Sequence, residues 1–141
     1  ETLSLAAANT VLDKYKTQGI TKYFNEIGSY LLENLNTLID NEELNEIFWT
    51  SGHPSWSFLH IKGQLQYSDF EIKTFFLQEM FKRGILTLGS HNISFSHSKE
   101  DIDKLLDTYQ VVLPMVKKHI EQQDLLENIH GDILQPLFKV R

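Results

Sequence analysis

Hydrophobic residues recur at steps of three and four positions between Ile20 and Leu38, and this spacing constrains the fold more than any other feature. The series consists of Ile20, Tyr23, Phe24, Ile27, Leu31, Leu35 and Leu38. Polar residues such as Glu26 and Glu33 fall between them. This pattern predicts a long amphipathic helix with one apolar face.

Two further helices begin at serine residues. Ser68 stands three residues before Glu71, which is the form of a capping box. Ser98 stands before a last long helix whose apolar residues run from position 102 to position 120. Pro114 lies inside this helix and is expected to kink or split it, because proline removes a backbone donor and clashes with the preceding turn.

An alanine-rich segment at residues 3–16 precedes the long amphipathic helix, and Gln18-Gly19 supplies a stop signal between them. Its larger apolar residues, including Leu5, Val11 and Leu12, have helical spacing. We therefore expect a buried first helix.

Strand-like segments alternate with the helices. A strand is expected to begin at Ile47-Phe48-Trp49, and residues 55–62 alternate as a central strand should. Residues 85–88 and 91–97 indicate two more short strands, arranged as a hairpin-like pair. The pattern predicts an α/β fold, an α+β sandwich in which helices cover a small, mostly antiparallel sheet. All 141 residues are expected to form a single domain.

Composition excludes several classes of function. The formal net charge is −6 and the basic residues are scattered, so nucleic acid is not an expected partner. The apolar runs are far too short to cross a membrane. The chain has no cysteine, and the spacing of its histidines matches no metal motif, so no metal site is expected. The chain opens on Glu1-Thr2-Leu3, without an initiating methionine or a signal peptide, and we expect it to be cut from a larger protein.

A group of polar residues at a strand entrance, Ser90, His91 and Asn92, is the best candidate for the edge of a binding site. Their interpretation as ordinary residues of a half-buried strand stays open. His91 and His97 would lie roughly 20 Å apart on an extended strand and cannot share one ion. A serine–histidine hydrolase is the least favoured alternative, because no GxSxG nucleophile elbow occurs.

Aromatic residues raise a second question. Trp56 follows a proline turn, and we expect it to be buried in the domain's own core, although an exposed position beside a cleft is the alternative. Four phenylalanines between positions 70 and 81 cannot all lie on one helical face. One face is therefore expected to meet something outside the domain.

Several segments, in their order along the chain, resemble class III aminotransferases, which depend on pyridoxal phosphate. Residues 1–8, ETLSLAAA, resemble the start of the helix that follows the cofactor-lysine segment in this family. Residues 79–86, EMFKRGIL, are similar to the family's run from a helix end into a strand. The most specific match is at residues 89–98, GSHNISFSHS, followed by residues 100–103, EDID, which together resemble the family's SxxH(T/S)xxDID signature. Residues 136–141 resemble the C-terminus of the branch that includes glutamate-1-semialdehyde aminomutase.

The resemblance implies that this chain is the C-terminal small domain of a cytoplasmic aminotransferase or aminomutase of fold type I. The large domain of that enzyme would bind pyridoxal phosphate, and a dimer mate and small amino donors and acceptors would be its other partners. The catalytic lysine, the acidic partner of the pyridine nitrogen and the phosphate-binding groups would lie in the large domain. Neither Lys62 nor Thr2 replaces them. The fragment itself is expected to bind no cofactor and to be non-catalytic, with Ser90, His91 and Asn92 at one edge of the substrate cleft.

A different class of function stays open beside this one. The chain could be a self-sufficient binding module that recognises a small ligand or a partner helix through the region of Trp49, Trp56 and Phe75. The enzyme-fragment hypothesis predicts an exposed apolar surface. The binding-module hypothesis predicts a closed surface with its own pocket.

Overall fold

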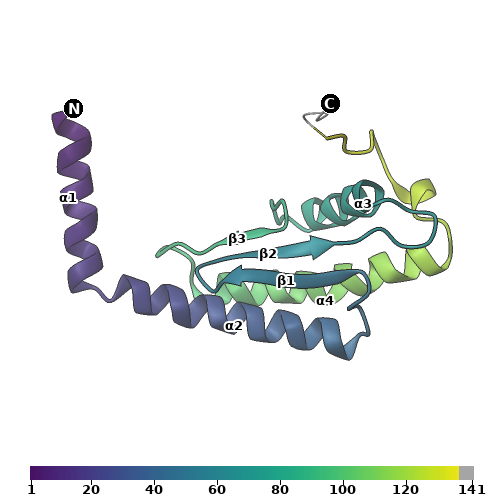
Figure 1. The fold of residues 1–141 in the computed structure, drawn as a ribbon, viewed down its shortest axis with the longest axis horizontal. Coiled ribbons are helices and arrows are strands. Elements are labelled where there is room, and N and C mark those ends of the chain that lie inside the picture. The colour runs from purple at the N-terminus through teal and green to yellow at the C-terminus, as the bar shows by residue number, and fades with distance from the viewer. Residues whose placement is uncertain (137–141) are drawn as a thin grey trace.

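Three helices cover one face of a three-stranded antiparallel sheet in the computed structural model, which describes residues 1–136 (Figure 1). The elements in chain order are α1 (Thr2–Thr17), α2 (Ile20–Asn41), β1 (Phe48–His53), β2 (Trp56–Ile61), α3 (Asp69–Lys82), β3 (Ser90–Asn92), α4 (Lys99–Glu121) and the short 3-10 helix η1 (Leu126–Asn128). The predicted α+β class, with a small antiparallel sheet and helices packed on it, is confirmed.

The strand order is β1-β2-β3, and β2 is central, as the alternation of residues 55–62 predicts. β1 and β2 form a tight hairpin in which His53 pairs with Trp56. The turn of this hairpin lies directly against α2. A Cβ atom added to Gly28 would come within 1.9 Å of the carbonyl oxygen of Pro54, so only glycine allows the helix and the turn to approach so closely.

The two predicted helix starts are confirmed. The side chain of Ser68 accepts the amide of Glu71, and that of Ser98 accepts the amide of Asp101; both form capping boxes. Of the two expected effects of Pro114, a kink or a split, the split does not occur, because α4 continues from residue 99 to residue 121. The carbonyl that loses its helical partner belongs to Gln110, which is exposed, so water can satisfy that carbonyl.

The main core lies between the sheet and α2, α3 and α4. Its largest fully buried side chains are Tyr109, Phe48, Phe75, Phe76, Leu35, Leu44, Ile72, Met80 and Leu113. A smaller cluster of Leu31, Ile93 and Ile102 lies beside β3. Phe75 and Phe76 are buried and Phe81 is exposed, which agrees with the expectation that the phenylalanines of α3 do not share one face.

The prediction of a buried first helix is wrong. α1 contains no buried residue, and Leu3 and Leu5 are 78% and 68% exposed. Figure 1 shows that α1 stands away from the rest of the fold, turning at Gly19, whose φ is +64°. Among residues 1–136, its one aromatic contact joins Tyr15 and Phe24 edge to face. Helical spacing alone did not reveal that the described residues provide no surface to cover this helix.

The predicted hairpin-like pair of strands is also wrong. Residues 85–88 form no strand. Of the predicted segment 91–97, only His91 and Asn92 lie in the sheet, where they belong to β3 and pair with β2. After α3, the amide of Ile85 returns to the carbonyl of Met80, and Gly84 and Gly89 both have positive φ. These two glycines bend the chain away from extended pairing at each end of the segment.

Trp56 is 59% exposed, so the expected burial of this residue is wrong and the exposed alternative holds.

No helix within residues 1–136 is long and apolar enough to cross a membrane.

Candidate functional site

The three residues predicted at the cleft edge lie together on β3, but the alternation of the strand separates their side chains. His91 is 5% exposed and turns inward, where it pairs with Ser57 of β2. Ser90 and Asn92 are exposed and lie opposite Phe58 and Trp56 on the outer side of the sheet. A ligand at the outer side can therefore reach Ser90 and Asn92, while His91 belongs to the interior.

His91 is held at both ring nitrogens by hydroxyl groups. Its Nδ1 lies 3.0 Å from Oγ of Ser57, and its Nε2 lies 2.8 Å from the hydroxyl of Tyr109. Burial lowers the pKa of His91 from 6.5 to about 4. The imidazole is thus neutral at pH 7, with one ring nitrogen donating and the other accepting.

Tyr109 is fully buried and anchors this chain of hydrogen bonds to α4. Burial raises the pKa of its phenol, so Tyr109 stays protonated. Its ring stacks on Phe76 with centroids 6.2 Å apart and an interplanar angle of 15°. The three residues therefore form a rigid connection between β2, β3 and α4 beneath the candidate site.

The contact between Ser57 and His91 does not make a hydrolase site. Ser57 is fully buried, so a substrate cannot reach its hydroxyl. The third member of the chain is the phenol of Tyr109, whereas a nucleophilic triad needs an acceptor such as a carboxylate at that position. The geometry favours a structural role for this chain of hydrogen bonds.

A groove of about 380 Å³ lies beside β3. Its apolar wall includes Leu31, Ile85, Leu86, Ile93, Ile102 and Leu105. Its polar side includes all three predicted residues, Ser90, His91 and Asn92, together with His97 and Asp101. His97 accepts the amide of Ser94 at Nδ1, at 3.2 Å, and this places the ring beside the start of α4. Hydrogen bonds with the backbone and side chain of Ser98 lower the pKa of Asp101, which therefore carries a negative charge in the groove.

The residues that line this groove do not fit pyridoxal phosphate. None of them is a lysine that could form the Schiff base, and none is an arginine that could hold the phosphate. Lys62 lies elsewhere, directly after β2, and is exposed. The groove can offer hydroxyl, amide, imidazole and carboxylate groups to a ligand, but this chain's groove cannot hold the cofactor by itself.

The outer face of the sheet carries exposed aromatic side chains. Trp49 is 43% exposed and stacks on His60, with centroids 4.9 Å apart and an interplanar angle of 13°. Trp56 packs against Phe58 on the same face. The binding-module hypothesis requires Phe75 to share a surface with the two tryptophans. Phe75 is 1% exposed and lies in the core, so it does not.

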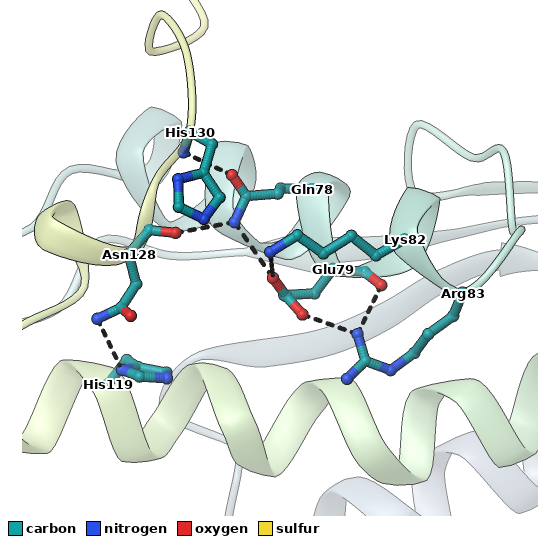
Figure 2. Close-up of polar contacts among 7 residues, drawn as sticks. All are labelled: Gln78, Glu79, Lys82, Arg83, His119, Asn128 and His130. Atoms are coloured by element: carbon teal, nitrogen blue, oxygen red, sulfur yellow. Dashed lines mark hydrogen bonds and ion pairs between the residues drawn. The ribbon is translucent and has the colours of Figure 1, made fainter.

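A second polar cluster lies on α3, away from the groove. Figure 2 shows the carboxylate of Glu79 between Lys82 and Arg83, each at 2.7 Å. Burial alone would raise the pKa of Glu79, but hydrogen bonds from Lys82, Arg83 and Gln78 lower it to about 2. The cluster is a satisfied ion pair that fixes the end of α3, and it contains no group poised for chemistry.

The amide of Gln78 ties the segment after α4 to α3. Its Nε2 donates to the carbonyl of Asn128 at 2.8 Å, and its Oε1 accepts the amide of His130 at 2.6 Å (Figure 2). Nearby, Nδ1 of His119 lies 2.7 Å from the carboxylate of Asp124. Within residues 1–136, no three His, Cys, Asp or Glu side chains come together as a metal site would require.

Comparison with known proteins adds no identification: no protein-family model and no curated protein matches this chain.

Sequence reasoning found the position of β3 but missed Ser57 and Tyr109, which support it. These residues are 34 and 18 positions from His91, and no local pattern connects them. An isolated tyrosine at an apolar position of a predicted helix was the one available signal, because a buried phenol needs a hydrogen-bond partner.

Proposed function

We propose that this chain is the C-terminal small domain of a cytoplasmic class III aminotransferase or aminomutase, and that the larger domain of that enzyme binds pyridoxal phosphate. In this proposal Ser90 and Asn92 face the substrate cleft, while His91 holds their strand in place. The isolated domain is non-catalytic. A dimer mate and small amino donors and acceptors are the further partners.

The exposed apolar surface of α1 is the observation that carries the proposal. Leu3, Leu5, Val11 and Leu12 are each at least half exposed, and no residue of the helix is buried. Apolar helices are normally covered, because contiguous apolar surface is unfavourable in water. The proposed large domain supplies that cover. The resemblance of residues 1–8 to the helix start of the family supports the same interpretation.

The chemistry of the groove is compatible with a supporting role. Pyridoxal phosphate supplies the electron-withdrawing group for amino transfer in such enzymes. Ser90 and Asn92 can orient a substrate by hydrogen bonds from the outer side of the sheet. The neutral imidazole of His91 is already committed to Ser57 and Tyr109, so its role is to position the strand.

The alternative of a self-sufficient binding module keeps one supporting observation, the exposed pair of Trp49 and Trp56 on the outer face.

A titration of the chain with pyridoxal phosphate, followed by borohydride reduction and mass spectrometry, tests where the cofactor binds. We expect no stoichiometric adduct. A single lysine modified in full would place the cofactor site within this chain and contradict the proposal.

A further inference from the structure

The backbone of β3 has a free edge. The amide of Leu59 donates to the carbonyl of Gly89 at 2.7 Å, and the amide of Ile93 donates to the carbonyl of Ser55 at 3.0 Å. In an antiparallel pair, residues whose backbone groups point to the partner strand alternate with residues whose groups point away. The backbone groups of residues 89, 91 and 93 therefore point toward β2. The N–H and C=O groups of Ser90 and Asn92 therefore point away from β2.

The groove lies along β3 and is also lined by residues 84–87, which precede the strand. It is bordered by β3 on one side and has Ile102 and Leu105 of α4 and Leu31 of α2 in its wall. The wall residues Ile93 and Ile102 belong to the small hydrophobic cluster beside β3. A strand placed here would extend the sheet over the helices and direct alternate side chains into an apolar wall.

We propose that the free edge of β3 binds an extended peptide segment of a partner protein, which adds a fourth antiparallel or parallel strand to the sheet. One apolar side chain of the segment fills the groove, and a basic side chain lies beside Asp101. This inference does not rest on the proposed enzyme, because it depends only on the pairing of β3 and on the groove. It assigns the groove to a peptide rather than to a small substrate.

Three features of the edge select this occupant. Backbone groups at Ser90 and Asn92 offer main-chain hydrogen bonds, the source of affinity when a peptide is added to a sheet. Leu86, which lines the groove, is 90% exposed, so an apolar side chain of the segment would gain cover against it. Asp101 is charged, no lysine or arginine lines the groove, and the chain as a whole carries a net charge of −6. A basic segment is therefore preferred over an acidic one.

The test uses the whole 141-residue chain and the synthetic peptide acetyl-Lys-Val-Thr-Val-Thr-Val-Lys-amide. Two further versions carry N-methyl groups, either on the even or on the odd residues between the terminal lysines. A strand presents alternate amides to its neighbour, so one version should lose binding about tenfold or more and the other should bind as the parent does. A version with glutamate in place of both lysines should bind more weakly than the parent.

NMR spectra of the 15N-labelled chain supply the site. The parent peptide should shift the amides of Ser90 and Asn92 and slow their hydrogen exchange, while the amide of His91 is protected even without peptide. Asn92→Pro removes one outward N–H and should abolish peptide binding. The variant should still fold, since proline is tolerated where an edge N–H faces solvent. Asn92→Ala keeps that N–H and should bind normally. The methylated peptides provide the same test if the proline variant does not fold.

Equal binding of both methylated peptides would overturn the proposal, as would the absence of shifts at Ser90 and Asn92 at millimolar peptide. Protection of these two amides that grows with protein concentration in the absence of peptide would instead show pairing between two copies of this chain, and it would also overturn the proposal. None of these results bears on whether a larger domain binds pyridoxal phosphate.

Discussion

Nε2 of His91 lies 2.8 Å from the hydroxyl of Tyr109, in a contact that is closed to water on both sides of the hydrogen bond. Burial keeps the imidazole neutral, and because Ser57 occupies the other ring nitrogen, the ring has no free position. The edge strand that carries Ser90 and Asn92 is thereby fixed to the centre of the fold.

Stability should depend on pH through His91. Its folded-state pKa of about 4 lies below the unfolded value of 6.5, so the unfolded chain binds more protons between these values. The stabilisation is complete above about pH 6.5 and is lost as pH falls toward 4, by about 3 kcal/mol in total. Urea unfolding of wild type and His91→Gln between pH 4 and 7 measures this difference. Identical pH slopes for the two proteins would contradict it.

Tyr109→Phe should destabilise the fold by about 1–3 kcal/mol, because it leaves a buried nitrogen of His91 without its partner. Tyr15→Phe is a matched control, since Tyr15 is 40% exposed. Chemical denaturation at pH 7 should show almost no change for the control. A Tyr109→Phe protein as stable as the control would show that the hydrogen bond contributes nothing.

Gly28→Ala should destabilise the domain, although glycine to alanine inside a helix usually stabilises by roughly 0.5–1 kcal/mol. The reversal is expected because the new Cβ would meet the backbone of Pro54 at 1.9 Å, and a backbone atom cannot move aside easily. We expect a loss of about 2 kcal/mol or more, measured as a fall in Tm. Asn25→Ala, on the exposed side of α2, should change Tm little. An unchanged or raised Tm for Gly28→Ala would mean that the hairpin does not pack on α2 as described.

Glu79→Gln should lower the free energy of unfolding at pH 7 by about 1–3 kcal/mol, because Lys82 and Arg83 lose a buried carboxylate. The folded-state pKa of about 2 is below the usual value, so this contribution is present above pH 4.5 and fades as pH falls toward 2. Glu26→Gln, which removes an exposed pair at 3.6 Å, is the control and should cost less than about 0.5 kcal/mol. The difference in stability between the two variants should shrink as pH falls from 4.5 toward 2, and a constant difference over that range would argue against the assignment.

Removal of residues 1–17 should leave the stability of the remaining domain within about 1 kcal/mol, since α1 buries no residue. The same deletion should reduce binding of a hydrophobic dye, because it removes the exposed Leu3, Leu5, Val11 and Leu12. Denaturation curves and dye fluorescence of the two proteins test both statements. A large fall in stability would show that α1 packs on the fold in solution.

The parts of the fold that could be predicted from sequence are those with local physical signals. Ser68 and Ser98 mark helix starts because each side chain bonds an amide three residues away. The alternation of residues 55–62 identified the central strand because one side of β2 is buried.

The errors arise where tertiary context decides the outcome. α1 has the composition of a buried helix, but none of its residues is buried by the rest of the described chain. Trp56 faces outward because the hairpin turns it to the open side of the sheet. At the candidate site, the sequence placed Ser90, His91 and Asn92 together. It could not show that His91 turns inward, since that orientation depends on pairing with Ser57 and Tyr109. Of the C-terminal resemblance, only Pro136 lies within the described residues, and positions 137–141 fall outside them.

The most direct test of the proposed function is a chimera in which this chain replaces the small domain of a class III aminotransferase. The absorbance of bound pyridoxal phosphate is followed as an amino donor is added. We predict a saturable change in that absorbance, which is the signature of amino transfer to the cofactor, and no such change in the same enzyme without its small domain. A chimera that is dimeric and holds the cofactor, yet shows no response to any donor that the parent enzyme uses, would contradict the account.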